Sequence, residues 1–415
     1  MTTTRARHVA VVARSVFPLH GLGGLERSVS DLVHYLAGAG VRVTLITRTP
    51  QRGSPAIDEP GLTTRVVPYR TFPFAGRRGT TVLDRSTAYP LFGERAGRLA
   101  WTLVRDESID IVHGFGASVL GYARRRGNAT APLVLNPQGL EEFGATDPSR
   151  ARLKRAAYLP LRRAVLRCAR AADCVIATDR VLEPAVITHL AVERSRIRVI
   201  PNALDVPAID RLASAADASR VRREAGAGST ELVLLSVGRL EHNKGFHVLA
   251  AALGALRDHA ATIAEGSWRW VVVGDGPYRR SLESAIGKAG ISKHTHLAGR
   301  VSEKDLHAWY EAADLFVHPS LYEGSSLVTL EAMAHRRPVV ATTAGGLPDK
   351  VRPGINGWLV PPGDASALAA AISGAAAQAD RFVQMGSASR AIVDEEFSWS
   401  AAGAAVLRLY DELLE

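Results

Sequence analysis

Two glutamates eight residues apart, Glu323 and Glu331, are the residues whose types and spacing most favour chemistry. Glu323 lies in a short polar loop after the apolar run at residues 314–317, which is typical of a buried strand. Glu331 lies in the helical pattern that follows, with Ser325 or Ser326 as a natural N-cap. The spacing therefore predicts a strand, a tight loop and a helix, with carboxylates about two turns apart along the helix axis.

This arrangement suits an elongated polar ligand. The N-terminus of a helix offers unpaired N–H groups and a partial positive charge, both of which favour a phosphate. Two carboxylates at this separation could accept hydrogen bonds from hydroxyls at both ends of one ligand, for example a sugar and a ribose. The alternative is an exposed helix that carries ordinary surface glutamates.

A second group of candidates follows the apolar run at residues 231–237. Gly238, Arg239 and Lys244 lie in a loop before a helix that begins near Phe246. Two cations beside a helix N-terminus could bind a diphosphate through charge-assisted hydrogen bonds. A further turn after the next apolar run contains Gly276.

Gly23 and Gly24 precede a helical pattern after the first apolar run, at residues 8–13. Glycines at this position could let backbone amides approach a phosphate closely, although a plain tight turn explains them equally well. The loop lacks GxGxxG, and the chain has no Walker lysine–serine pair. Neither a dinucleotide site nor a P-loop is therefore supported.

Two polar residues mark strand ends in the first half of the chain. His113 ends the run at residues 110–113, and Gln138 follows the run at residues 132–136. Carboxyl ends of parallel strands share one edge of a sheet, so both side chains are expected to face one crevice. A single histidine at a strand end is more often structural than catalytic, which remains the alternative for His113.

The length and the alternation of apolar runs with helical patterns predict an α/β fold with two doubly wound domains. We place the first domain at residues 1–205, as the acceptor-binding domain, and the second at residues 206–395, as the donor-binding domain. Residues 396–415 form a last helix long enough to return to the first domain. Residues 50–98, rich in proline, glycine and arginine, are expected to form a long loop region.

Charge is distributed unevenly along the chain. Residues 1–200 hold 30 Lys and Arg against 16 Asp and Glu, a net charge of +14, whereas residues 201–415 have a net charge of −4. A basic half suggests an anionic partner, such as a lipid surface, a phosphorylated substrate or a nucleic acid. Because the basic residues lack interleaved aromatics and no recognition module is present, no nucleic-acid partner is expected.

The strongest local concentration of charge lies at residues 150–170, which contain no acidic residue. The cations of this run are Arg150, Arg152, Lys154, Arg155, Arg162, Arg163, Arg167 and Arg170. Apolar residues are interleaved with them, as in basic amphipathic helices that lie on anionic membranes. The alternative is a solvated outer helix of a doubly wound domain.

The cysteines and the N-terminus bear on localisation. Cys168 and Cys174 are the only cysteines, and their spacing fits neither a metal knuckle nor a redox pair. The apolar run after His8 is too short for a signal-peptide core, and no run approaches the length of a membrane span. We expect a cytoplasmic protein, with peripheral attachment to the inner membrane face as a hypothesis.

Several spaced motifs resemble the retaining glycosyltransferases of family 4, also described as glycosyl transferases group 1. They are the segments 237–245, 274–277, 344–348 and 356–360, together with Glu323 and Glu331. The resemblance covers nearly the whole chain and is most specific at residues 236–362. It implies the GT-B architecture, in which two Rossmann-like domains face each other across a cleft and the C-terminal helix returns to the N-terminal domain.

The resemblance also implies roles for individual residues. Arg239 and Lys244 would bind the diphosphate of a nucleotide-sugar, and Glu323 would face the donor sugar, so these three are the catalytic candidates. The implied donor-binding residues are Gly23, Gly24, Gly238, Gly276, Arg300, Val301, Ser325, Ser326, Leu327 and Glu331. Where many members have His-Gly, this chain has Gln138-Gly139, which leaves His113 and Gln138 as candidate sugar or acceptor contacts.

The implied activity is transfer of a sugar, with retention, from a UDP- or GDP-linked donor to a hydroxyl of a glycan, a lipid or a small molecule. No metal or other cofactor is expected, because no DxD motif occurs in a suitable context and the cations can stabilise the leaving phosphate. The alternatives are a GT-B enzyme that epimerises or hydrolyses a nucleotide-sugar and, more remotely, a basic nucleic-acid-binding protein.

Overall fold

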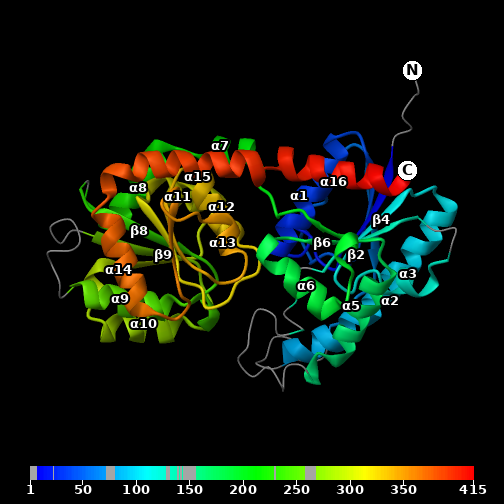
Figure 1. Ribbon diagram of the computed structural model, residues 1–415, viewed down its shortest axis with the longest axis horizontal. Helices are drawn as coiled ribbons and strands as arrows, with labels where there is room; N and C mark the ends of the chain where they lie inside the picture. Colours follow the sequence, from blue (N-terminus) through cyan, green and yellow to red (C-terminus); the bar gives the residue numbers. More distant parts are fainter. Residues whose placement is uncertain are drawn as a thin grey trace. The chain divides into compact units, whose positions relative to one another are not determined.

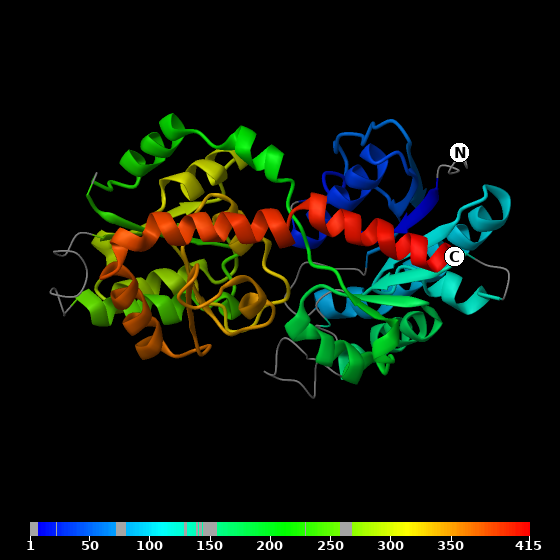
Figure 2. The same cartoon turned by 45° about the horizontal axis from the view of Figure 1, so that its top comes forward.

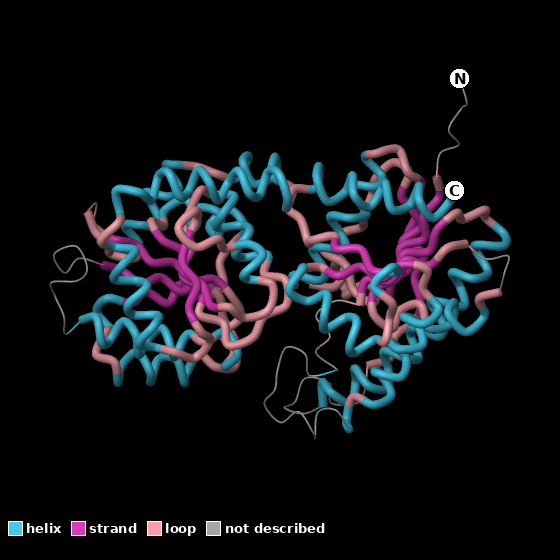
Figure 3. The backbone as a smooth tube through the Cα atoms, in the orientation of Figure 1, coloured by secondary structure: helices cyan, strands magenta, loops and turns pink. Residues whose placement is uncertain are grey.

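The computed structural model describes residues 7–21, 23–71, 80–127, 131–137, 140, 143, 156–228, 230–257 and 268–415. Contacts divide the chain into two compact units. The first unit comprises Met1–Asn202 and Trp399–Glu415, and the second comprises Ala203–Ser398. Each unit is built around one parallel sheet with helices on both faces (Figures 1 and 3).

The sheet of the first unit has the order β3-β2-β1-β4-β5-β6-β7, and every pair of neighbours is parallel. Its strands are β1 (His8–Val12), β2 (Arg42–Arg48), β3 (Leu62–Val67), β4 (Ile111–Phe115), β5 (Leu133–Asn136), β6 (Cys174–Ala177) and β7 (Ile197–Val199). The direction of winding reverses between β1 and β4, which pair through Val11 and His113 among others.

Helices cover both faces of this sheet. On one face, α2, α3, α5 and α6 enclose the main apolar core, and α1 and α16 lie on the other face (Figure 1). Their bounds are α1 (Gly24–Gly38), α2 (Thr80–Asp106), α3 (Leu120–Arg125), α5 (Leu159–Ala171), α6 (Glu183–Leu190) and α16 (Trp399–Leu414), with 3-10 turns η2 (Arg180–Leu182) and η3 (Arg194–Arg196).

The expected loop region at residues 50–98 is wrong for most of its described part, which contains β3 and the first two-thirds of α2. Two of the glycines that suggested a loop, Gly93 and Gly97, are instead contact points of α2 with the segment at residues 117–122. A Cβ atom at Gly93 would lie 1.9 Å from the carbonyl oxygen of Ala117, and one at Gly97 would lie 2.4 Å from the amide of Tyr122. Such close packing of α2 on α3 overrides the low helix propensity of glycine.

The second unit contains a six-stranded parallel sheet in the order β10-β9-β8-β11-β12-β13. Its strands are β8 (Leu232–Val237), β9 (Trp268–Val273), β10 (Thr295–Gly299), β11 (Leu315–His318), β12 (Val339–Thr342) and β13 (Gly357–Val360). Strands β8 and β11 are neighbours, so the winding reverses between them. Ligands of such sheets bind at the carboxyl ends of the strands beside this reversal.

Two apolar cores lie on the two faces of the second sheet. Helices α7, α8, α11, α12 and α15 enclose one core, and α9, α10 and α14 enclose the other (Figure 1). The bounds are α7 (Val206–Leu212), α8 (Ala215–Glu224), α9 (Phe246–Arg257), α10 (Arg279–Lys288), α11 (Glu303–Ala312), α12 (Leu327–Ala334), α13 (Leu347–Lys350), α14 (Ala365–Ala376) and α15 (Phe382–Glu396), with 3-10 turns η4 (His242–Lys244), η6 (Ser292–His294) and η7 (Ala379–Arg381).

The last helix, α16, belongs to the first unit and lies against α1 (Figures 1 and 2). The rings of Tyr35 and Trp399 stack at 5.7 Å, and a Cβ atom at Gly403 would lie 2.2 Å from the Tyr35 ring. The predicted fold class, two doubly wound domains with a returning C-terminal helix, is therefore confirmed. The units divide after Asn202 and after Ser398, and the amide of Leu204 bonds to the carbonyl of Phe397 within the second unit.

Candidate active site

The loops after β8 and β11 meet where the winding of the second sheet reverses. The amide of Leu321 donates to the carbonyl of Asn243 at 2.8 Å, which joins the two loops. Gly245 has a φ of +68°, and a Cβ atom there would lie 1.9 Å from the carbonyl oxygen of Pro319. Only glycine fits both the left-handed backbone and this close approach. The loop that carries Lys244 is thereby fixed against the loop that carries Glu323.

Glu323 is the centre of a hydrogen-bond network. Its Oε2 atom accepts from Lys244 Nζ at 2.6 Å, from His318 Nε2 at 2.8 Å and from Ser320 Oγ at 3.2 Å. The amide of Gly324 donates to Oε1 at 3.2 Å. The side chain of Glu323 is 12% exposed and that of His318 is fully buried, so the network is mostly buried and reaches the surface at Glu323.

The charges of this network are fixed by its surroundings. Burial alone raises the pKa of a carboxyl group, but the charge of Lys244 and the hydrogen bond from His318 outweigh burial and hold the pKa of Glu323 far below its usual range. Burial also lowers the pKa of His318, so its imidazole is neutral and Nε2 carries the proton donated to Glu323. Glu323 is therefore an anion at neutral pH and cannot act as a general acid.

The N-terminus of α12 lies immediately after this carboxylate. Ser326 is the N-cap, and its side chain accepts a hydrogen bond from the amide of Thr329. Ser325 precedes the cap, with its Oγ 3.3 Å from Nζ of the buried Lys350, and Leu327 is the first residue of the helix. The predicted strand, loop and helix are present, and of the two serines offered as the cap, Ser326 takes that position.

Glu331 lies along the same helix but inside the protein, at 5% exposure. The hydroxyl of Tyr310, from α11, donates to its Oε2 atom at 2.7 Å. The alternative of an ordinary surface glutamate is therefore wrong for Glu331, because the residue is buried. A carboxylate at this depth needs hydrogen-bonding partners, and Tyr310 is one of them. Its predicted contact with a ribose remains a prediction.

Glycine turns bring the other loops of this sheet edge into contact. Gly238 and Gly274 have φ values of +155° and +131°, and a Cβ atom at Gly274 would lie 2.0 Å from the carbonyl oxygen of Gly238. One at Gly276 would lie 2.4 Å from the carbonyl oxygen of Leu240. A Cβ atom at Gly345 would likewise lie 1.9 Å from the carbonyl oxygen of Glu323. Predicted donor-binding residues Gly238 and Gly276 are thus part of one tightly packed rim.

Three predicted residues lie on the outside of this rim. The side chain of Arg239 is 69% exposed and its Nε is 3.1 Å from Oε1 of Glu241, whereas Lys244 binds Glu323. The two predicted phosphate-binding cations therefore contact different carboxylates in this structure. Arg300 is exposed and Val301 is half-buried directly after β10, at the same edge of the sheet.

The first unit places its predicted residues at the reversal between β1 and β4. Gly23 is the N-cap of α1 and Gly24 its first residue, and the backbone of Gly23 is extended. A Cβ atom at Gly23 would lie 2.1 Å from Oε2 of Glu26, so an acidic side chain covers this glycine. Gln138 lies outside the described residues.

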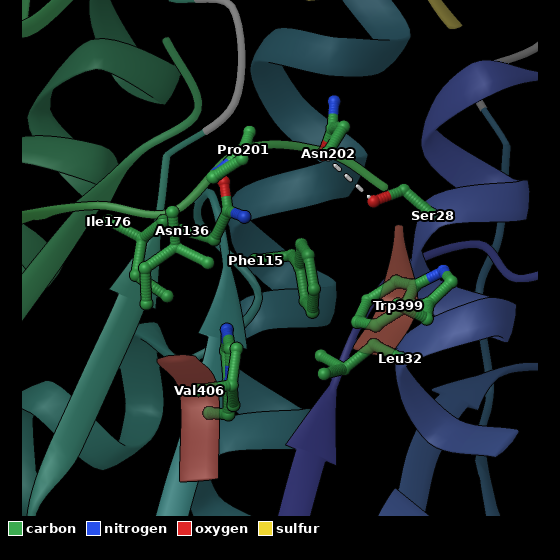
Figure 4. Close-up of a pocket in the computed structure, with 11 residues that line it drawn as sticks. Ser28, Leu32, Phe115, Asn136, Ile176, Pro201, Asn202, Trp399 and Val406 are labelled. Carbon is green, nitrogen blue, oxygen red and sulfur yellow. Dashed lines mark hydrogen bonds between the residues drawn. The ribbon is translucent and has the colours of Figure 1, made fainter. Parts of the chain in front are cut away.

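His113 is an interior residue, 1% exposed, in the middle of β4. Its Nδ1 atom is 2.7 Å from the hydroxyl of Tyr410 in α16, and its Nε2 atom has no hydrogen-bond partner among the described residues. It lines a cavity of about 20 Å³, enough for one water molecule. Figure 4 shows Ser28 bonded to Asn202 beside this cavity. The predicted contact of His113 with a sugar or an acceptor remains a prediction.

The described part of the basic run forms α5, and residues 150–155 of that run lie outside the described residues. The apolar face of α5 is buried in the core of the first unit through Leu161, Val165 and Cys168. This face cannot also enter a membrane. Among the described residues of the run, Arg163, Arg167 and Arg170 are exposed.

Two family models match the chain. "Glycosyltransferase Family 4" matches residues 22–207 and "Glycosyl transferases group 1" matches residues 231–378, so the two together span most of the chain. The chain belongs to the family 4 glycosyltransferases. It is 29% identical to a D-inositol 3-phosphate glycosyltransferase of Xylanimonas cellulosilytica, over 99% of this chain and 98% of that one. It is 27% identical to one of Streptomyces scabiei, over 98% and 91%.

Solved structures agree with this assignment. Sucrose-phosphate synthase from Thermosynechococcus elongatus superposes with a TM-score of 0.77 at 24% identity, covering 98% of this chain and 99% of that one. HepE of Anabaena, solved with UDP-glucose, gives a TM-score of 0.69 at 21% identity, covering 98% and 99%. At such identities the likeness establishes the fold, and this glycosyltransferase therefore has the GT-B fold.

Four residues around the predicted site of this glycosyltransferase were not assigned from the sequence: His318, Ser320, Tyr310 and Lys350. His318 and Ser320 stand in the stretch that contains Glu323, and the polar residue that ends β11 was a usable signal. Tyr310 and Lys350 gave no comparable signal, because their partners lie 21 and 25 residues away in the chain.

No helix in the described part of this glycosyltransferase is both long enough and apolar enough to span a membrane.

Proposed function

We propose that the protein transfers a sugar from a UDP- or GDP-linked donor to a hydroxyl of a glycan, a lipid or a small-molecule acceptor, with retention and without a metal ion. The observation that carries this proposal is the ion pair of Lys244 and Glu323 at the N-terminus of α12, beside the winding reversal. The cation Lys244, the amides at the N-terminus of α12 and the anion Glu323 lie close together. The cation and the amides complement a diphosphate, and the anion can accept hydrogen bonds from the hydroxyls of a sugar.

The proposed reaction breaks the bond between the anomeric carbon and the β-phosphate oxygen and forms a bond to the acceptor oxygen on the same face. The acceptor proton passes to the leaving phosphate. Negative charge develops on that phosphate, so preorganised donors near it lower the barrier most. We assign this task to Lys244, Arg239 and the amides after Ser325, and hydrogen bonding to the donor sugar to Glu323.

The ionisation of Glu323 weighs against hydrolysis by a carboxylate pair. A hydrolase of that kind needs a protonated carboxyl group to donate to the leaving oxygen. The low pKa of Glu323 keeps this group charged, and Glu331 is buried against Tyr310. Turnover of the donor that needs no acceptor would nevertheless reveal a hydrolase or an epimerase.

The acceptor and its location are part of the proposal. Two relatives are named for D-inositol 3-phosphate, an anionic polyol, and the charge of +14 on residues 1–200 would suit an anionic acceptor. We propose that a lipid-linked acceptor would be met at an anionic membrane surface, with the exposed arginines of α5 as the contact. This attachment would be electrostatic, since the apolar face of α5 is buried.

A thermal-shift panel of nucleoside diphosphates and their sugars tests the donor class, because a ligand that binds the folded state raises its melting temperature. We expect UDP or GDP and one of their sugars to stabilise the protein. With that donor, the anomeric configuration of the product, read by NMR, tests retention. Unchanged transfer after treatment with EDTA tests independence from metal, and the proposal fails if no nucleotide-sugar is consumed with any acceptor.

A further inference from the structure

Lys350, the last residue of α13, is a lysine with no exposed surface. Its Nζ atom donates to the carbonyl of Gly346 at 3.1 Å and to Ser325 Oγ at 3.3 Å, and it lies 5.5 Å from the centre of the Phe397 ring. Burying an ammonium group costs several kcal/mol unless other groups compensate for the lost water. A lysine at this depth is therefore held by its hydrogen-bond acceptors, and Ser325 is one of them.

The position of Lys350 relates it to the candidate donor site. Ser325 is the residue before the N-cap of α12, and it is only partly buried. The loop before α13 is bound to the Glu323 loop, since the amide of Gly346 donates to the carbonyl of Gly324 at 3.0 Å. Lys350 thus lies behind the N-terminus of α12, while Lys244 contacts Glu323 on the same loop.

The hydrogen bond from Lys350 determines how Ser325 can act. A lysine ammonium only donates, so the Ser325 oxygen must accept in this bond. A serine hydroxyl has one hydrogen, and that hydrogen is then available to donate to another acceptor. An anionic oxygen in front of the helix N-terminus is the acceptor that this geometry favours, because the helix end and the lysine charge both attract it.

We propose that Lys350 is a positioning residue for the donor diphosphate: it fixes Ser325 as a hydrogen-bond donor and adds positive charge behind the α12 N-terminus. This inference rests on the proposed function. It assigns Lys350 a role in binding the donor phosphates although Lys350 itself does not touch the donor. The other explanation is that Lys350 only holds the glycine loop at residues 344–346 in place.

Binding of UDP and GDP, measured by calorimetry beside UMP and GMP, tests the proposal. The variants are Lys350→Met, Ser325→Ala and the double variant, with the exposed Lys288→Met of α10 as the matched control. We expect each single variant to weaken diphosphate binding by about tenfold, which corresponds to about 1.4 kcal/mol, because a charge-assisted hydrogen bond to the phosphate is weakened. The monophosphates should change much less, and the control should match the unchanged chain.

The double variant separates the two explanations. If Lys350 acts through Ser325, the double variant loses no more than the more affected single variant, because coupled residues are not additive. If Lys350→Met lowers the unliganded melting temperature but keeps the affinity for diphosphate, the role is structural and the proposal is wrong. Should Lys350→Met fail to fold, Ser325→Ala decides alone, and undiminished diphosphate binding by that variant overturns the proposal.

The same measurements distinguish a failure of the proposed function from a failure of the role proposed for Lys350. If the unchanged chain binds no nucleoside diphosphate, the proposed function is overturned, and the role of Lys350 with it. If the unchanged chain binds a diphosphate and Lys244→Ala abolishes this while Lys350→Met has no effect, the proposed function stands and only the role of Lys350 is lost.

Discussion

At the scale of single residues, Glu323 is held by three hydrogen-bond donors on one oxygen atom. Lys244 is the donor that carries charge, and it has two tasks that can be separated. It keeps a mostly buried carboxylate ionised, and in the proposed reaction it also binds the diphosphate. Removing it should therefore affect both stability and activity.

We expect Lys244→Met to lower the melting temperature, because breaking a buried ion pair from one side costs about 3–5 kcal/mol before relaxation and exposure reduce it. Transfer activity should fall at least 100-fold, as for loss of one donor to a developing oxyanion. The double variant Lys244→Met with Glu323→Gln should regain most of the stability and none of the activity. Full transfer activity with unchanged donor affinity in Lys244→Met would show that Lys244 has no role in binding the donor.

A substitution at Tyr310 tests whether Glu331 contributes to binding of the donor. Tyr310→Phe removes the hydroxyl that donates to a buried carboxylate and leaves the ring in place. We expect a loss of about 1–3 kcal/mol in the free energy of unfolding and a raised KM for the donor with a smaller change in kcat. Steady-state kinetics check this split, and a fall in kcat alone would contradict a role of Glu331 in ground-state binding of the donor.

At the scale of elements, the candidate site is assembled from loops that glycines allow to touch. Gly345 shows the constraint most clearly, with a φ of +53° and a potential Cβ position 1.9 Å from the backbone oxygen of Glu323. The contact is to backbone, so no side-chain rotation can relieve it. A displaced Gly345 would move the Glu323 loop itself.

Gly345→Ala should lower both the melting temperature and the transfer activity. Gly374 of α14 provides the matched control, because a Cβ atom there meets nothing within 4 Å. Gly374→Ala should raise the free energy of unfolding by about 0.5–1 kcal/mol, since alanine favours a helix more than glycine does. Equal effects of the two substitutions, measured by thermal melts and initial rates, would contradict the steric argument.

Helix α5 presents exposed arginines over a buried apolar face. If it contacts anionic lipid, replacing Arg163, Arg167 and Arg170 by glutamine should weaken flotation with anionic vesicles, by about 1 kcal/mol per residue. Neutral vesicles should bind neither form, and added salt should release the unchanged chain. Equal recovery of both forms with anionic vesicles would exclude this surface as the contact.

At the scale of the whole molecule, the C-terminal helix α16 is joined to β4 within the first unit by the bond between His113 and Tyr410, 297 residues apart. Burial lowers the pKa of His113 to about 3. The unfolded chain therefore binds more protons at this residue than the folded chain between about pH 6.5 and pH 3. Stability must consequently fall as the pH is lowered through this window.

The variant His113→Gln keeps a hydrogen-bonding side chain and removes the titration. Between pH 7 and pH 5 the unchanged chain should lose about 2 kcal/mol more unfolding free energy than the variant does, from the shift in this one pKa. Urea unfolding at both pH values measures the difference. An identical pH dependence in both proteins would mean that His113 is not held neutral in the interior.

The described structure agrees with the sequence most where local pattern is decisive. The strand, loop and helix around Glu323, the cap at Ser326 and the doubly wound class follow from apolar periodicity and capping chemistry, which act over a few residues. The loop predicted for the stretch that forms most of α2 is wrong, because Gly93 and Gly97 serve contacts with the segment at residues 117–122 rather than turns.

The sequence by itself determined the family, the fold class and the candidate carboxylates and cations, because each of these is written in short motifs with fixed spacing. Only the tertiary structure decided which of these groups touch: Lys244 with Glu323, Tyr310 with Glu331, Lys350 with Ser325, and His113 with Tyr410. The physical reason is that such pairs depend on strand order and helix packing, which bring together residues that are distant in the chain.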